Sequence, residues 1–166
     1  MINSKKITRT ALLIAMTVLL GYVESLFSPI IPVPGIKLGL ANAVVMLVLY
    51  ADSAKTAWTV SLLKVVLCSV LFGTATSFLY SLCGAVLSLF VMMLAKKVKI
   101  FSVPGVSAIG GIIHNLGQLL CAYFFIGKGA IFYIPVLCVS GAVCGALIGI
   151  AVQLILIRGG DLFGKE

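Results

Sequence analysis

Long apolar stretches separated by short polar segments constrain this chain more than any other feature of its sequence. Crossing the hydrocarbon core of a bilayer takes roughly 20 residues of helix, and the backbone there must satisfy its own hydrogen bonds. The stretches therefore predict an all-α integral membrane protein, a bundle of six transmembrane helices that forms a single domain over residues 1–166. The expected helices are residues 10–27, 38–51 and 56–72, then 78–95, the stretch that follows Pro104-Gly105 and reaches residue 126, and 133–157.

The composition supports the same class of protein. Hydrophobic residues make up 62% of the 166 residues and charged residues only 10%, whereas ordinary soluble domains are about one quarter charged. The net charge of +8 is explained better by orientation in the membrane than by binding to nucleic acid, because cytoplasmic loops carry an excess of Lys and Arg.

The positions of the basic residues predict the orientation. With the N-terminus in the cytoplasm, the outer loops carry only Lys37 and Lys128. The inner segments carry the remaining basic residues outside the helices, which are Lys5, Lys6, Arg9, Lys55, Lys96, Lys97, Lys99, Arg158 and Lys165. We therefore expect a multi-pass protein of the cell membrane with both termini in the cytoplasm.

A few polar residues lie inside the apolar stretches, where ionisable groups cost about 2.5–3.5 kcal/mol each on insertion scales. Most of them fall in the middle and outer half of the expected bundle, which favours an outward-facing polar cavity. They are Glu24, Asn42, Lys64, His114, Asn115 and Gln118, while Gln153 lies nearer the inner end. For any single amide, a structural role that holds helices together is as well supported as a role in ligand binding.

His114, Asn115 and Gln118 favour a binding site when taken together, because His114 and Gln118 are four residues apart and share a helix face. Lys64 has two interpretations. Its ammonium either pairs within the protein, for example with Glu24, or meets a bound anion. Structural pairing is the favoured interpretation.

Small residues form two further patterns. Gly141, Gly145 and Gly149 are spaced for close helix packing, which we expect within the bundle. Ala11 and Ala15 serve either the same purpose or docking on a second membrane protein. The proline-rich loop at residues 29–37 is stiff and apolar, so it suits either a lid or a segment lying on the bilayer.

The sequence contains no motif for nucleotide or cofactor binding, no metal-binding cluster and no catalytic constellation. Its five cysteines, Cys68, Cys83, Cys121, Cys138 and Cys144, lie in apolar runs and are expected to be small buried side chains. If the protein takes part in a process that needs ATP, another polypeptide must therefore hydrolyse the ATP.

Two motifs resemble a known family. PGIKLGLAN at residues 34–42 and GGIIHNLGQ at residues 110–118 are similar to motifs of the Gx transporter family. That family also carries the label heptaprenyl diphosphate synthase component I, and it resembles the substrate-binding S components of energy-coupling factor (ECF) transporters.

The resemblance implies a subunit that binds a small-molecule substrate from outside and works with an ECF T subunit and two cytoplasmic ATPases. It places the T-subunit interface at Ala11 and Ala15, and substrate contacts at Lys37, Asn42 and the group around His114. A vitamin, a flavin and a prenyl- or quinone-related compound all remain open as substrates.

Two other functions are weighed against import. One is a non-catalytic membrane subunit or anchor of a heptaprenyl diphosphate synthase. Catalysis by the chain itself is not expected, because Asp52 and Asp161 stand alone where that chemistry uses paired aspartates to hold magnesium. The other is a secondary transporter, for which Glu24 is the only carboxylate suited to ion coupling.

Overall fold

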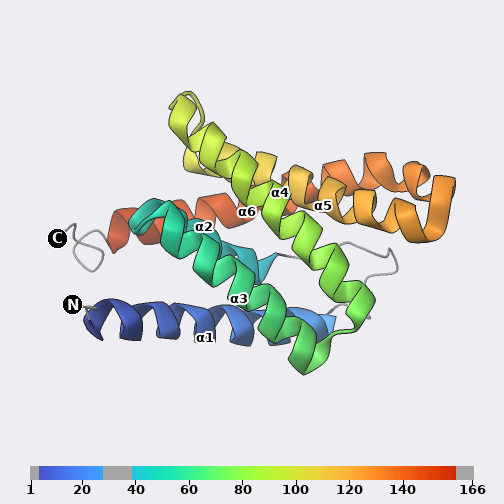
Figure 1. Cartoon of the computed structure of the whole chain (residues 1–166). Coiled ribbons are helices and arrows are strands. Elements are labelled where there is room, and N and C mark those ends of the chain that lie inside the picture. Colours follow the sequence, from blue (N-terminus) through green and yellow to red (C-terminus); the bar gives the residue numbers. More distant parts are fainter. Residues whose placement is uncertain (1–3, 28–38, 160–166) are drawn as a thin grey trace.

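The structure, a computed structural model, describes residues 4–27 and 39–159. Within those residues every regular element is helical (Figure 1), which confirms the all-α prediction. The elements are α1 (Ser4–Phe27), α2 (Leu40–Ala51), α3 (Ala54–Phe72), α4 (Ala75–Val98), α5 (Val103–Ile126), the 3₁₀ helix η2 (Gly127–Tyr133) and α6 (Ile134–Arg158).

Hydroxyl side chains set the starts of three helices. Ser53, Thr74 and Ser102 each precede a helix and accept a hydrogen bond from a backbone N–H of its first turn. Such caps satisfy amide groups that have no partner inside the helix. They explain why α3, α4 and α5 begin two or three residues before the apolar stretches from which they were predicted.

The second helix differs from the prediction of a full transmembrane span. α2 has 12 residues, so at about 1.5 Å per residue it is about 18 Å long, against a hydrocarbon core of about 30 Å. The other five α-helices have 19 to 25 residues. Among the α-helices of the described residues, α2 alone is therefore much too short to cross the membrane by itself.

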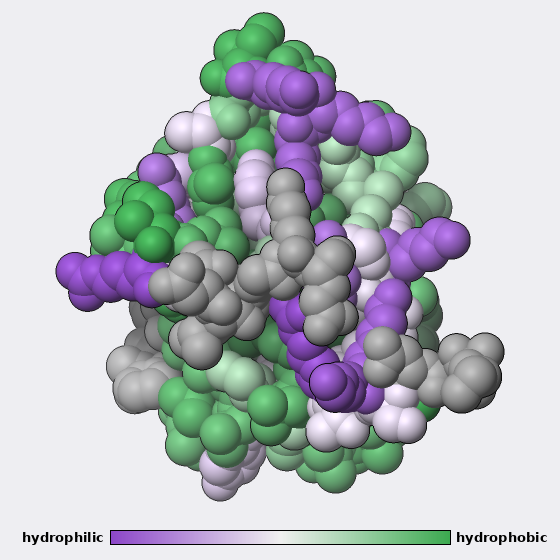
Figure 2. All heavy atoms as spheres, turned by 90° about the vertical axis from the view of Figure 1, so that its left-hand side faces the viewer, coloured by the Kyte–Doolittle hydropathy of each residue, from purple (hydrophilic) through white to green (hydrophobic). Residues whose placement is uncertain are grey.

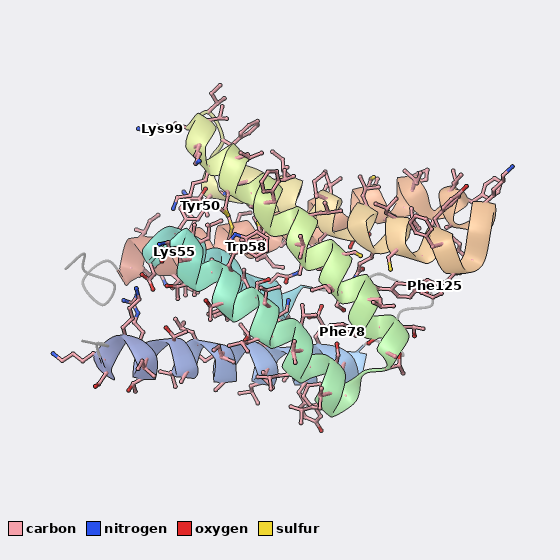
Figure 3. The ribbon with its side chains drawn as sticks, viewed as in Figure 1. Tyr50, Lys55, Trp58, Phe78, Lys99 and Phe125 are labelled. Carbon is pink, nitrogen blue, oxygen red and sulfur yellow. The ribbon has the colours of Figure 1, made fainter. Side chains whose placement is uncertain are left out.

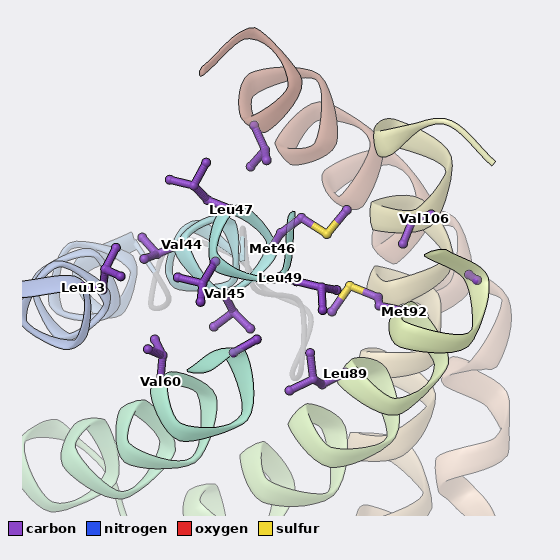
Figure 4. Close-up of a cluster of buried hydrophobic side chains, with 14 residues drawn as sticks. Leu13, Val44, Val45, Met46, Leu47, Leu49, Val60, Leu89, Met92 and Val106 are labelled. Atoms are coloured by element: carbon purple, nitrogen blue, oxygen red, sulfur yellow. The ribbon is translucent and has the colours of Figure 1, made fainter. Parts of the chain in front are cut away.

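The short helix α2 lies at the centre of the bundle. Val44 to Leu49 are all at most 8% exposed, so this helix is covered on every side. Figure 4 shows their side chains radiating toward Leu13 of α1, Val60 of α3, and Leu89 and Met92 of α4. Burial of this continuous apolar run holds α1, α3 and α4 around one core.

Glycines bring α4, α5 and α6 into close contact. An ideal Cβ on Gly111 of α5 would lie 2.2 Å from the carbonyl oxygen of Gly141 on α6. An ideal Cβ on Gly145 of α6 would lie 2.5 Å from the carbonyl oxygen of Ser107 on α5. The glycine stripe of α6 therefore packs within the bundle, which confirms the expectation from its spacing.

The basic residues gather at one end of the bundle. This end lies at the left in Figure 1, where α1, α3 and α5 begin and where α2, α4 and α6 end. Figure 3 shows Lys55 and Lys99 at this end and Phe125 at the other, and Figure 2 shows hydrophilic side chains across the same face. We call this face the basic end; its described basic residues are Lys5, Lys6, Arg9, Lys55, Lys96, Lys97, Lys99 and Arg158.

The outer surface along the helices is apolar. Val70, Phe90 and Leu147 are 78%, 54% and 62% exposed, and many other large apolar side chains are as open. Large exposed apolar areas of this kind are expected where lipid is the solvent. In the described part of the chain, four helical stretches are long and apolar enough to cross a membrane, namely Ser4–Leu26, Ala54–Phe72, Ala75–Val98 and Val103–Arg158. The last of them contains α5 and α6, which run in opposite directions in Figure 1.

Candidate ligand-binding site

A cavity of about 480 Å³ lies inside the bundle, and all six α-helices contribute to its wall. This volume is within the range of about 300–1,000 Å³ that is usual for small-molecule sites. The cavity brings together five of the residues predicted from the sequence, Glu24, Asn42, Lys64, His114 and Asn115. Lys37 and the proline-rich loop at residues 29–37 lie outside the described residues.

Lys64 and Asn42 form one side of the cavity. The Nζ of Lys64 on α3 donates to Oδ1 of Asn42 on α2 over 2.6 Å. Lys64 is only 8% exposed, and Asn42 is partly buried. A charged donor in such surroundings forms a stronger hydrogen bond than it would in water, so this contact fixes the position of both side chains against the cavity.

Glu24 lies where α1 meets the beginning of α2. Its carboxylate accepts a hydrogen bond from the backbone N–H of Gly39, the residue that precedes α2 and has a φ of 78°. Glycine adopts that backbone conformation without strain. A carboxylate at the amino end of a helix is also favoured by the helix dipole, so Glu24 positions α2 as well as lining the cavity.

Asn115 faces the cavity from α5 and ties that helix to α6. Its Nδ2 donates to the carbonyl oxygen of Leu137 over 2.8 Å and to Ser140 Oγ over 3.5 Å. The prediction left a structural role and a ligand role open for this amide. The structure shows that the amide nitrogen joins two helices, while the side chain also lines the cavity.

His114 and Gln118 share a buried face of α5, as their spacing predicted, but only His114 lines the cavity. Gln118 lies beside Gly84 of α4, whose ideal Cβ would be 2.9 Å from Gln118 Cγ and 3.1 Å from His114 Cε1. Gly84 therefore leaves room for both side chains where the two helices approach closely.

Serine hydroxyls on the cavity wall were not predicted as site residues. Ser77, Ser81 and Ser88 of α4 and Ser107 of α5 all line it. Ser88 also donates to the carbonyl oxygen of Gly110 over 2.8 Å. The first three serines occupy one face of α4 at helical spacing, and that periodicity was the signal available in the sequence.

Ala11 and Ala15 do not lie near the cavity. Both are exposed on α1 and border an apolar groove of about 570 Å³ between α1 and α3, which Leu67, Leu71 and Phe72 also line. Their small side chains leave this face of α1 smooth and uncovered by the described residues.

The apolar exterior and the long apolar helices define a multi-helix membrane protein, whose bundle contains a partly open cavity lined by polar and apolar side chains. A family model described as heptaprenyl diphosphate synthase component I matches residues 13–155. The chain therefore belongs to this family, the Gx transporter family, as its two motifs indicated. No curated protein and no solved structure matches the chain.

Proposed function

We propose that the protein is the substrate-binding membrane subunit, or S component, of an ECF-type importer for a small metabolite. The observation that carries the proposal is the convergence of Glu24, Asn42, Lys64, His114 and Asn115 on one cavity inside an apolar bundle. Polar groups held in the membrane interior are costly, and a ligand site explains why several of them meet around an open volume. The substrates considered are a vitamin, a flavin and a prenyl- or quinone-related compound.

The proposed topology has six crossings in the cell membrane, with both termini in the cytoplasm. It is supported by the basic end, which carries all the basic residues of the described segments except Lys64 and Lys128. Positive charge at the ends of transmembrane helices favours the cytoplasmic side. In this orientation the whole chain forms one membrane domain, and the cavity is filled from the opposite side of the membrane.

The proposed partners are an ECF T subunit and two cytoplasmic ATPases. The groove beside Ala11 and Ala15 supports a helical partner, because small exposed residues allow another helix to approach closely within a membrane. The chain supplies binding and its partners supply energy, so no catalytic role is assigned to it.

The experiment that tests binding is native mass spectrometry of the protein purified from its own host in mild detergent. We expect a bound small molecule that is lost from His114→Ala and retained by Lys128→Ala, which changes a residue outside the cavity lining. Thermal melting of each variant shows whether the bundle remains folded. A folded wild-type protein that never holds a small molecule would contradict the proposal.

The partner interface is tested by co-purification of the T subunit and ATPases. Ala11→Trp fills the groove between α1 and α3, and we expect it to abolish co-purification. Leu12→Trp is the matched control, because Leu12 is 63% exposed on the same helix but does not line the groove. Equal recovery of partners with both variants would exclude this surface.

The family description favours one other function, a non-catalytic membrane subunit or anchor of a heptaprenyl diphosphate synthase. The basic end suits an acidic soluble partner, with Lys97 and Lys99 both exposed. Synthase activity measured with and without the protein in vesicles tests this function. Unchanged synthase activity, together with the absence of an attached synthase in native mass spectrometry, would exclude this function.

A further inference from the structure

Two of the five cysteines lie together on facing helices. Cys121 of α5 is buried and Cys83 of α4 is half-buried, and their thiol side chains share a hydrogen bond. Both are free thiols in the structure. The sequence predicted only small buried side chains for all five cysteines, because nothing in the spacing of two residues on different helices shows that they meet.

The contacts on either side of the two cysteines show that α4 and α5 face each other along this stretch. Toward the basic end, an ideal Cβ on Gly117 of α5 would lie 3.0 Å from both the carbonyl oxygen of Cys83 and the Cα of Gly84. Toward the other end, the rings of Tyr80 and Phe125 meet edge to face, with their centroids 5.9 Å apart. The pair Cys83 and Cys121 therefore occupies one layer of a continuous antiparallel contact, between a glycine layer and an aromatic layer.

The close approach of the two backbones suits a disulfide bond. Such a bond requires Cα atoms about 4.4–6.8 Å apart, whereas the axes of packed helices are usually about 8–10 Å apart. The backbone contact at Gly84 and Gly117 brings α4 and α5 close together, so side chains as short as cysteine meet across the interface. Forming the bond then requires rotation of two small side chains and little movement of the backbone.

We propose that Cys83 and Cys121 are a redox-dependent modification site, at which a reversible disulfide links α4 to α5. The two thiols lose two protons and two electrons as the sulfur–sulfur bond forms. A membrane-soluble two-electron oxidant, such as an azo compound or a quinone, takes up both protons and both electrons. The site does not depend on the proposed function in import.

The link would lie beside the cavity. An ideal Cβ on Gly84, next to Cys83, would be 2.8 Å from the carbonyl oxygen of His114, and both His114 and Ser81 line the cavity. Oxidation therefore fixes the separation of α4 and α5 at this part of the cavity wall, and reduction releases it.

The experiment treats the reduced full-length protein, in mild detergent and in native membranes, with diamide, an azo compound that two thiols reduce to a hydrazine. The remaining free thiols are alkylated in denaturant and counted by intact mass spectrometry, and proteolysis then identifies the linked peptides. Of the five thiols of wild type, we expect two to be lost and three to remain, with one product that joins residues 83 and 121. Dithiothreitol should restore all five.

Serine variants separate this pair from the other cysteines. Cys83→Ser keeps a side chain of similar size but leaves Cys121 without a second thiol, so we expect all four remaining thiols to survive diamide. The matched control is Cys138→Ser on α6, which should still form the link and retain two free thiols. Oxidation should raise the melting temperature of wild type and Cys138→Ser by at least about 5 °C and leave that of Cys83→Ser unchanged.

Three results would overturn the proposal. The first is a folded wild-type protein in which all five thiols survive diamide, both in detergent and in native membranes. The second is a linked product that joins any other two cysteines in place of residues 83 and 121. The third is a loss of two thiols from folded Cys83→Ser, which would show that Cys83 is not needed for the reaction. Thermal melting before oxidation shows whether each variant is folded.

Discussion

An alanine at Gly111 tests how closely α5 and α6 must approach to enclose the cavity. Its Cβ would lie 2.2 Å from the carbonyl oxygen of Gly141 and 3.0 Å from the carbonyl carbon. Non-bonded carbon atoms rest about 3.5–4.0 Å apart, and both of these neighbours belong to the backbone. No side-chain rotation relieves the clash, so the two helices must separate by roughly 1 Å at this point.

The size of the effect follows from two opposing terms. Overpacking lowers the free energy of unfolding by about 1–3 kcal/mol and occasionally more. Because the clash here is with the backbone, we expect a cost of about 3 kcal/mol or above. Alanine recovers about 1 kcal/mol relative to glycine inside a helix. The expected net loss is about 2–3 kcal/mol, and at about 2–4 °C per kcal/mol for a chain of this size the melting temperature should fall by roughly 5–10 °C.

The assay is thermal unfolding of purified variants in the same detergent, with two further glycines as references. Gly129→Ala has no described atom within 4 Å of its Cβ, so its melting temperature should equal that of wild type. Gly117→Ala places its Cβ 3.0 Å from Cys83 O, so its melting temperature should lie between those of wild type and Gly111→Ala. Melting of Gly111→Ala within about 2 °C of wild type, the range of a neutral surface change, would refute this account of the packing.

Two further substitutions test polar contacts inside the bundle. Lys96→Met removes a 2.6 Å hydrogen bond to the carbonyl oxygen of Leu49 at the end of α2. We expect thermal unfolding to show a loss of about 1.5–3 kcal/mol in the free energy of unfolding. The control Lys97→Met changes an exposed residue and should leave the stability nearly unchanged. A loss no larger than that of Lys97→Met would contradict the role of this contact. Ser88→Ala removes the buried hydrogen bond to Gly110 O and should cost about 1 kcal/mol in the same assay, and an unchanged melting temperature would show that the bond contributes nothing.

The positions of the helices could be predicted because apolar stretches in a bilayer have little alternative to helix. A short second helix was predicted as well, at residues 38–51, but its exact start at Leu40 could not be predicted in the same way. Its sequence is as apolar as its neighbours, and the end of a helix depends on local backbone geometry such as the positive φ of Gly39. The gathering of the basic residues at one end followed from charge and chain direction alone.

The cavity was predicted in part, for reasons that differ from residue to residue. Asn42, Lys64 and Asn115 were found because polar side chains are rare in apolar helices. Gln118 was chosen by the same argument, but it packs beside Gly84 and does not line the cavity. Which side of a helix faces a neighbour depends on close contacts between distant residues, and sequence spacing does not determine them. For the same reason, the hydrogen-bond partners of Lys64 and Asn115 could not be predicted from the sequence.

The glycine contacts have a mechanical consequence. α4, α5 and α6 meet backbone to backbone through Gly84, Gly117 and Gly141, whereas α1, α2 and α3 meet through larger side chains such as Leu13, Val44 and Val60. The contacts among α4, α5 and α6 therefore cannot be relieved by a change of side-chain rotamer, whereas those among α1, α2 and α3 can adjust in this way. Residues of both halves line the cavity between them.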